Sequence, residues 1–301
     1  MLLENHSIWL IELGFDSDST AGKAGHMKPS PRRDFLLNVR IATLKSAKGL
    51  ISMFKTVSPK FAVFGAALCV LSSSGSAFAQ DRPIKGVVEL FTSQSCSSCP
   101  PADKVLGEVI MRGDVLGLAF HVDYWNYLDW KDTFSNEEST KRQYAYAKSL
   151  NSRQVYTPQM IVNGTDVVAA GSPEAVFQAM DAAGDGALSV DISAGIENET
   201  LVVKAGKGKG DANLVLLVFE TREMVDIKRG ENSGKKIEYH NAVTQVRTLG
   251  MWKGEDLSVE LPKREYLTDE GYSCAVILQR VTAQGTPGEI IGAALVSGLG
   301  A

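Results

Sequence analysis

Apolar and polar positions divide the middle of the chain into short blocks with different periods. GVVELFT (86–92) and VLGLAFHV (115–122) are nearly continuous apolar runs, which are typical of strands buried on both faces. Between them, ADKVLGEVIMR (102–112) has apolar residues three and four positions apart, which predicts an amphipathic helix. A strand, a helix and a second strand of these lengths predict a βαβ unit with parallel strands.

The following blocks continue the alternation of helices and strands. Ser135 begins the capping pattern Ser-Asn-Glu-Glu, which predicts the start of a second helix. QMIVN and TDVVAA predict two strands joined by a tight turn at Asn163-Gly164. Ser172-Pro173 suits the cap and first residue of a third helix, PEAVFQAMDAAG. Together these blocks predict an α/β domain over residues 84–186.

From residue 187 the pattern is that of strands alone. Several of the apolar runs have alternating polar positions, and turns rich in Gly, Asn and Lys separate them. The runs are LSVDISAGI, TLVVKAG, NLVLLVFE, AVTQVRTL, LSVELP, CAVILQRV and IIGAALV. This pattern predicts an all-β sandwich domain over residues 187–301.

The length of the chain is sufficient for two domains, and its charge argues against some classes of partner. The chain has 301 residues, of which 44% are apolar, and a net charge of −4. Residues 1–79 hold nine of the 31 Lys and Arg but five of the 35 Asp and Glu, so the remainder is acidic. An acidic body argues against nucleic acid or an anionic membrane surface as a partner.

The N-terminal part predicts export. Lys55 and Lys60 precede the uncharged run FAVFGAALCVL, and Ala77-Phe78-Ala79 supplies a small-x-small cleavage site. These are the three parts of a signal peptide, which we assign to residues 53–79. An uncleaved anchor is the alternative, although the apolar run is short for a membrane span. The expected location is therefore periplasmic or secreted, without stable membrane association after cleavage.

Residues 1–52 fit poorly ahead of such a signal. Met53 stands where a signal peptide would begin, so residues 1–52 are predicted to be an untranslated or disordered extension. PRRDFLL within it resembles a twin-arginine export motif, although a charged stretch separates it from the apolar run. Either export route leads to a compartment in which disulfides persist.

The cysteines carry the main chemical signal. The chain has four, and Cys69 would leave with the signal peptide. Of the three that remain, Cys96 and Cys99 are the expected pair, which leaves Cys274 as a buried, inert strand residue. The CxxC pair lies between a predicted strand and a predicted helix. Free N–H groups and the dipole of a helix start would favour a thiolate at Cys96, with Cys99 resolving the mixed disulfide.

Three longer strings support a family resemblance. ELFTSQSCSSCPPAD, AFHVDYWNYLDWKD and VYTPQMIVNG resemble the domain-of-unknown-function 1223 family of bacterial secreted proteins, across most of residues 84–300. The resemblance implies that the first domain is thioredoxin-like. In that fold, the peptide bond at Thr157-Pro158 is cis and the proline lies beside the dithiol. Ser97-Ser98 between the cysteines differs from thioredoxin, so no redox potential is carried over.

The sequence leaves three other readings of the pair open. A zinc site needs about four ligands, and few His or Cys accompany the pair. A Cu(I) carrier is a second possibility, because soft thiolates suit that ion. An inert disulfide in a partner-docking scaffold is the third. The favoured function is thiol–disulfide exchange with protein or peptide thiols or with a redox partner protein, without a cofactor.

Other residues are candidates for the same site. Glu89 lies in an apolar strand and is a candidate proton relay, with a salt-bridged structural role as the alternative. Asp123 and Trp125 follow the strand 115–122, whose C-terminal end should lie near the dithiol. Tyr156, with Thr157 and Pro158, would flank the same groove. His121 either borders this site or is a half-buried histidine with its hydrogen bonds satisfied. The predicted substrate-binding region consists of Asp123, Trp125, Tyr156, Thr157 and Pro158.

Overall fold

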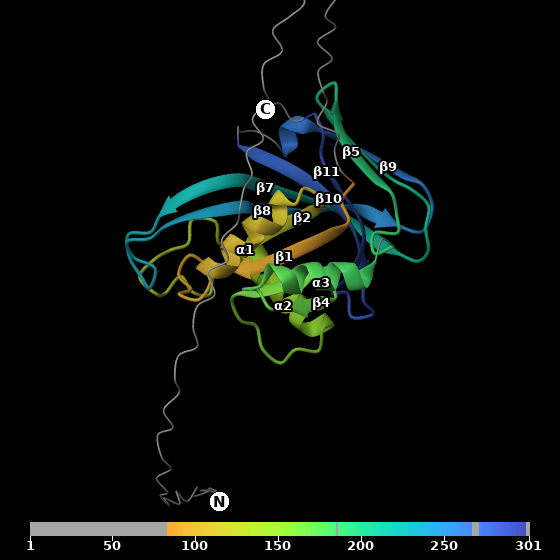
Figure 1. Cartoon of the computed structure of the whole chain (residues 1–301). Helices are drawn as coiled ribbons and strands as arrows, with labels where there is room; N and C mark the ends of the chain where they lie inside the picture. Colours follow the sequence, from red (N-terminus) through yellow and green to blue (C-terminus); the bar gives the residue numbers. More distant parts are fainter. Residues whose placement is uncertain (1–82, 185, 267–270, 299–301) are drawn as a thin grey trace, which may run out of the picture. The chain divides into compact units, whose positions relative to one another are not determined.

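The computed structural model describes residues 83–184, 186–266 and 271–298. The predicted extension 1–52 and signal segment 53–79 lie outside the described residues. The strands form two sheets, one of eight strands and one of three, accompanied by three α-helices (Figure 1). Within the described ranges, no helix is both long and apolar enough to cross a membrane.

The eight-stranded sheet has the order β11-β10-β7-β8-β2-β1-β3-β4. Its strands are β1 (Gly86–Thr92), β2 (Val115–His121), β3 (Gln159–Val162), β4 (Asp166–Val168), β7 (Ala212–Asp226), β8 (Lys236–Trp252), β10 (Tyr272–Val281) and β11 (Pro287–Leu295). The smaller sheet has the order β5-β6-β9 and consists of β5 (Ile192–Glu197), β6 (Thr200–Ala205) and β9 (Leu257–Pro262). The helices are α1 (Pro100–Met111), α2 (Glu137–Ser149), α3 (Pro173–Ala183) and the short 3₁₀ helix η1 (Lys263–Glu265).

The predicted elements of the first half are present. β1 and β2 are parallel, with α1 between them in the chain, and β3 and β4 form the antiparallel hairpin. The side chain of Ser172 accepts a hydrogen bond from the N–H of Ala175 and caps α3 as expected. The cap of α2 differs by one residue, because the side chain of Asn136 accepts from Ser139 N and Ser135 precedes it.

The predicted fold class, an α/β thioredoxin-like domain followed by an all-β sandwich domain, is wrong. The long strands β7 and β8 do not form a sandwich of their own but extend the sheet that begins with β1 and β2. The joint lies at β8, which pairs antiparallel with β7 and meets β2 in parallel at Ala119 and Ala242. The fold is therefore mostly β, built on one mixed sheet with few helices.

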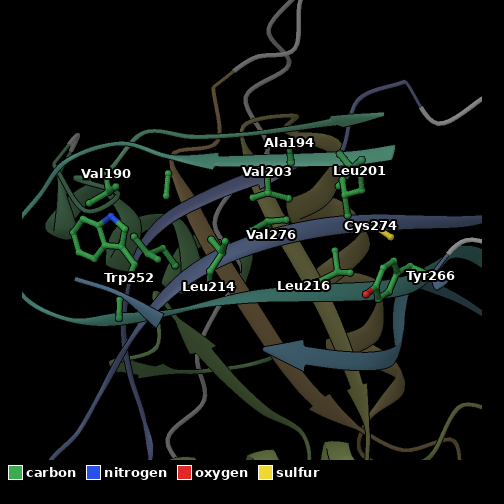
Figure 2. Packing of buried hydrophobic residues seen from close by; sticks show 14 of the residues in the cluster. Val190, Ala194, Leu201, Val203, Leu214, Leu216, Trp252, Tyr266, Cys274 and Val276 are labelled. Carbon is green, nitrogen blue, oxygen red and sulfur yellow. The ribbon is translucent and has the colours of Figure 1, made fainter. Parts of the chain in front are cut away.

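Both faces of the large sheet are buried, which explains the nearly continuous apolar runs. Leu214 and Leu216 of β7 face the small sheet and pack with Val203 and Trp252 (Figure 2). The alternate residue Leu217 faces the opposite side, in a cluster shared by β1, β2, α2 and β10. α1 and α3 cover β1 and β3 through a third cluster. Burial on both faces holds β1 and β2 rigidly, and their C-terminal ends lie beside the cysteine pair.

Candidate functional site

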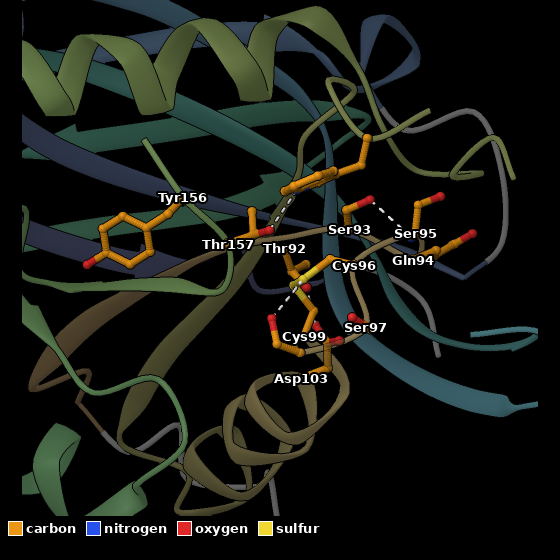
Figure 3. Close-up of a disulfide and its surroundings, with 12 residues drawn as sticks. Thr92, Ser93, Gln94, Ser95, Cys96, Ser97, Cys99, Asp103, Tyr156 and Thr157 are labelled. Atoms are coloured by element: carbon orange, nitrogen blue, oxygen red, sulfur yellow. Dashed lines mark hydrogen bonds between the residues drawn. A yellow bond between two sulfur atoms is a disulfide. The ribbon is translucent and has the colours of Figure 1, made fainter. Parts of the chain in front are cut away.

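The cysteine pair lies at the C-terminal ends of two parallel strands. Thr92, the last residue of β1, is paired with His121, the last residue of β2. The chain then turns through residues 93–98, and Cys99 is the N-cap of α1. Cys96 and Cys99 form a disulfide in this turn (Figure 3). The predicted pairing of Cys96 with Cys99 is therefore observed.

The two sulfur-bearing residues differ in exposure. Cys99 is 0% exposed and Cys96 is 5% exposed, while Ser97 and Ser98 between them are exposed. Neither cysteine belongs to the three apolar clusters. Cys96 is therefore the member nearer the surface, although it is more covered than the sequence suggested. Cys274 is free and fully buried in an apolar cluster, and burial raises the pKa of its thiol to about 12.

The helix start does not offer the free amides that the sequence argument invoked. Proline has no N–H, so Pro100 and the residue after it contribute none. The next two amides, of Ala102 and Asp103, donate to the carbonyl of Cys99. The hydroxyl of Ser98 lies 3.4 Å from Cys96 Sγ and is the donor there, since a disulfide sulfur carries no hydrogen. Any anion at Cys96 is stabilised by the helix dipole and this hydroxyl.

A loop between β7 and β8 contacts the turn that holds the disulfide. The side chain of Asn232, which is fully buried, donates to the carbonyl oxygens of Gln94 and Cys96, at 2.9 Å each. Glu231 beside it accepts from the N–H of Ser97 at 3.3 Å. The contact between Asn232 and Cys96 joins residues 136 positions apart in the chain. The loop is therefore bound to the backbone of the cysteine turn on both sides of Cys96.

We expect Asn232→Ala to make the disulfide easier to reduce. The change leaves two carbonyl oxygens without their donor, which costs the closed arrangement about 1–3 kcal/mol. Reduction by dithiothreitol should be faster by about 10-fold, because loop opening becomes less costly. The matched control is Ser233→Ala, which removes a hydrogen bond inside the same loop, to Lys228 O. Equal rates in both variants and the original chain would show that the loop does not limit access.

Beneath the disulfide lies a buried polar cluster, which we define as Thr92, Asp103, His121, Asp132 and Tyr239. The hydroxyl of Thr92 donates to Asp103 Oδ1 at 2.8 Å. His121 Nδ1 lies 2.8 Å from Asp132 Oδ2, and both side chains are fully buried. The ring centroids of His121 and Tyr239 are 5.0 Å apart. The cluster therefore joins β1, α1, β2 and β8 below the cysteine pair.

Burial and mutual charge shift the pKa values of this cluster. Burial raises the pKa of Asp103 to about 7, against the opposing effects of His121 and the Thr92 hydrogen bond. Burial alone would lower the pKa of His121, but the charge and hydrogen bond of Asp132 leave it raised. Burial raises the pKa of Tyr239, and the charges of Asp103 and Asp132 add to the effect. A carboxyl that titrates near neutral pH thus lies one helical turn from Cys99.

Glu89, the predicted proton relay, is held in an ion pair. Its Oε1 accepts from Arg142 Nε at 2.7 Å, and its other oxygen accepts from the hydroxyl of Tyr146. Arg142 also donates to Gln279 Oε1 at 2.9 Å. Glu89 faces α2, on the side of the sheet opposite α1, so its interactions are the salt-bridged alternative that the sequence left open.

The predicted substrate-binding residues are only partly brought together. The peptide bond before Pro158 is cis, and Gln159 next to it pairs with Phe91 of β1, which places this turn beside the cysteine loop. Trp125 Nε1 donates to Thr157 Oγ1 at 2.8 Å. Asp123 instead contacts Thr140 of α2, which donates to its Oδ1 at 2.6 Å. Next to the turn at Thr157 and Pro158, the side chain of Tyr156 is 47% exposed.

The sequence argument missed the residues that surround the pair. Asp103 had the pattern of an ordinary first-turn acid of a helix. Asn232 and Tyr239 lay in one of the turns between predicted strands. The one available signal was the position of Asp103, four residues after Cys99. Within the described part of the chain, no three His, Cys, Asp or Glu side chains are grouped so as to hold a metal ion.

A groove of about 970 Å³ opens beside the start of α1. It lies between α1 and the hairpin of β7 and β8, and Pro100, which follows the disulfide, forms part of its wall. Its charged lining residues are Lys104, Glu108, Arg222, Lys235, Lys236, Glu238 and His240. The charged side chains of the groove are therefore mostly cationic, and the groove begins next to the cysteine pair.

Comparison with known proteins places this geometry in a family. The crystal structure of protein AGR_C_4864 from Agrobacterium tumefaciens is 40% identical, with a TM-score of 0.67, and the match covers 73% of this chain and 97% of that one. HBP35 of Porphyromonas gingivalis is 16% identical with a TM-score of 0.53, over 70% of this chain and 74% of that one, a likeness of fold alone. No curated protein matches the chain. The family model described as "Protein of unknown function (DUF1223)" matches residues 87–279, so the chain belongs to that family.

Proposed function

We propose that the protein exchanges disulfides with protein or peptide thiols through Cys96 and Cys99. The observation that carries the proposal is a disulfide outside the apolar clusters, between the end of β1 and the start of α1, in a turn whose Ser97 and Ser98 are exposed. Its sulfur nearer solvent, at Cys96, is the one that a partner would attack. Cys99, fully buried, would leave as the other sulfur and would resolve the mixed disulfide in the reverse direction.

A purely structural role explains the pair less well. A bridge stabilises chiefly by closing a loop in the unfolded chain, and the sequence separation here is only three residues. Such a short loop corresponds to about 2 kcal/mol in the chain-entropy model. The turn is also already held by backbone hydrogen bonds, including Cys99 N to Cys96 O at 3.2 Å.

The surroundings supply surfaces for a partner chain. We propose that a peptide contacts the exposed ring of Tyr156 together with Thr157 and Pro158, which flank the cysteine loop on the β3 side. The groove that begins at Pro100 would hold further residues of the same partner on the α1 side. We also propose a periplasmic or secreted location, on the basis of the signal pattern at residues 53–79, because disulfide exchange partners occur there.

The proposal is tested by the redox equilibrium of the full chain in glutathione buffers. We expect two thiols to appear and disappear reversibly as the ratio of reduced to oxidised glutathione changes, with the fold retained. Alkylation followed by mass spectrometry would place both thiols at Cys96 and Cys99. A bridge that resists reduction until the protein unfolds would exclude exchange. Stoichiometric Cu(I) binding without reversible oxidation would support a metal carrier instead.

A further inference from the structure

Three side-chain polar atoms of the buried polar cluster make no hydrogen bond with the described residues. Asp103 Oδ2, His121 Nε2 and Tyr239 Oη are buried and, among the described residues, have no hydrogen-bond partner. Buried polar atoms are paired in the great majority of cases, because an unpaired one costs free energy. Three such atoms in one cluster indicate a function that needs them.

The cluster lies directly under the buried member of the cysteine pair. The N–H of Asp103 donates to the carbonyl of Cys99 at 3.1 Å, so the two residues occupy the same turn at the start of α1. Residues four positions apart share one face of a helix. Figure 3 shows Asp103 and Thr92 beside the disulfide, with their hydrogen bond drawn. The carboxyl group is thus fixed near Cys99 by a neighbouring hydroxyl.

Opening the disulfide creates a charge where a charge is costly. An incoming thiolate attacks Cys96 Sγ, the bond between Cys96 and Cys99 breaks, and its electron pair passes to Cys99 Sγ. Cys99 is 0% exposed, and a buried thiolate without a counter-charge is unfavourable. The reaction therefore requires a proton at Cys99, and solvent does not reach that position directly.

We propose that Asp103 delivers this proton to Cys99 when the disulfide opens and takes it back when the disulfide forms, an inference that rests on the proposed exchange function. The new bond joins the incoming sulfur to Cys96, Cys99 becomes a thiol, and Asp103 becomes a carboxylate. The charge of His121, which interacts with both Asp103 and Asp132, favours the ionised state of Asp103. In the reverse direction, Asp103 removes the proton and restores the Cys99 nucleophile.

The strands β1 and β2, the segment after β2, and β8 supply the groups around Asp103. The groups that face it are Thr92 from β1, His121 from β2, Asp132 from the segment after β2, and Tyr239 from β8. His240, also on β8, lies against Gly107 one turn further along α1. α3 packs against α1 still further on, where Arg112 lies over the ring of Phe177. The buried cluster therefore sets the protonation of Asp103, whose pKa of about 7 allows both states near neutral pH.

The test is the pH dependence of reduction by dithiothreitol, for the full chain and for Asp103→Asn. The rate at each pH is divided by the rate for oxidised glutathione with the same reagent, which removes the ionisation of the reagent. The original chain should show a high normalised rate below pH 7 and a decline above it, as Asp103 loses its proton. Asp103→Asn should be slower by at least about 10-fold at pH 6, without the inflection, and the two should converge at pH 9.

Controls separate this role from a structural one and from the failure of the exchange function. Glu137→Gln, an exposed acid of α2 outside the groove, should keep the original profile. Circular dichroism and the thermal midpoint at pH 8 should show that Asp103→Asn folds, since asparagine buries no charge. An equal loss of rate at all pH values, or an unchanged profile, would overturn the proton role while exchange stands. A disulfide that dithiothreitol reduces only in unfolded protein would overturn both.

Discussion

Replacing Cys99 with serine is expected to trap the protein covalently on its disulfide partners. Cys96 then attacks a substrate disulfide, one substrate sulfur leaves, and the other stays bound to Cys96 because a serine hydroxyl does not resolve the adduct. Turnover on a disulfide-bonded peptide should fall by at least about 10³-fold, a loss typical of removing one member of a group that acts as a unit. Adducts that disappear on reduction, mapped by mass spectrometry, are the measurement.

Two cysteine variants provide the matched controls. Cys96→Ser should form no adducts, because Cys99, the other member of the pair, is fully buried. Cys274→Ser should exchange at the original rate, since Cys274 lies in an apolar cluster and its thiol pKa is raised to about 12. Adducts at Cys99 would reverse the assigned roles, and adducts at Cys274 would contradict the location of the site. In cells of a suitable host, the adducts would also identify the partner.

Arg142→Met should cause the largest loss of stability. The side chain of Arg142 is 9% exposed and its partner Glu89 is 0% exposed, so the change leaves a buried carboxylate without its counter-charge. Removing one partner of such a pair costs about 3–5 kcal/mol. The same arginine also contacts Gln279 of β10 and lies over the ring of Phe120, which adds lost packing. The free energy of unfolding in urea measures the effect.

The double variant decides whether the charge is responsible. Glu89→Gln with Arg142→Met removes both charges, and it should recover a large part of the stability lost in Arg142→Met alone. An exposed helix pair, Glu137 and Lys141, gives the comparison, and Lys141→Met should change stability by no more than about 0.5 kcal/mol. A small effect of Arg142→Met would show that the hydrogen bond from Tyr146 satisfies Glu89 without the arginine.

The local elements could be predicted because their signals lie within a few residues. The apolar run 86–92 matches β1, and Ser172-Pro173 marks the start of α3. The fold class failed at a contact between distant segments. The residues around Tyr239 and Ala242 read as a charged loop followed by a strand of a separate sandwich, yet they form β8 and pair with β2. Such pairing depends on packing between halves of the chain, which periodicity does not report.

Some residues of the candidate site could likewise be predicted from the sequence, and others could not. Cys96, Cys99 and the turn at Pro158 were recognisable because each is a short pattern next to a strand. The buried polar cluster was not, because Asp103 and Tyr239 come together only through the sheet. Only the free amides invoked for the Cys96 thiolate are not observed, for a local reason that the sequence did contain: consecutive prolines remove two amides from the helix start. Chemistry that depends on burial could be assessed only after the fold was known.

The junction at β8 has a consequence for anyone who wishes to divide this protein. A fragment that ended near residue 186 would keep β1, β2 and the cysteine turn, but β2 would lose β8, its neighbour on the side away from β1. A bare, apolar strand edge of that kind recruits other chains and promotes aggregation. The fragment would also lose Asn232, which binds the cysteine turn, and Tyr239 of the buried polar cluster. The dithiol thus depends on residues encoded more than a hundred positions downstream, and only an intact polypeptide assembles it.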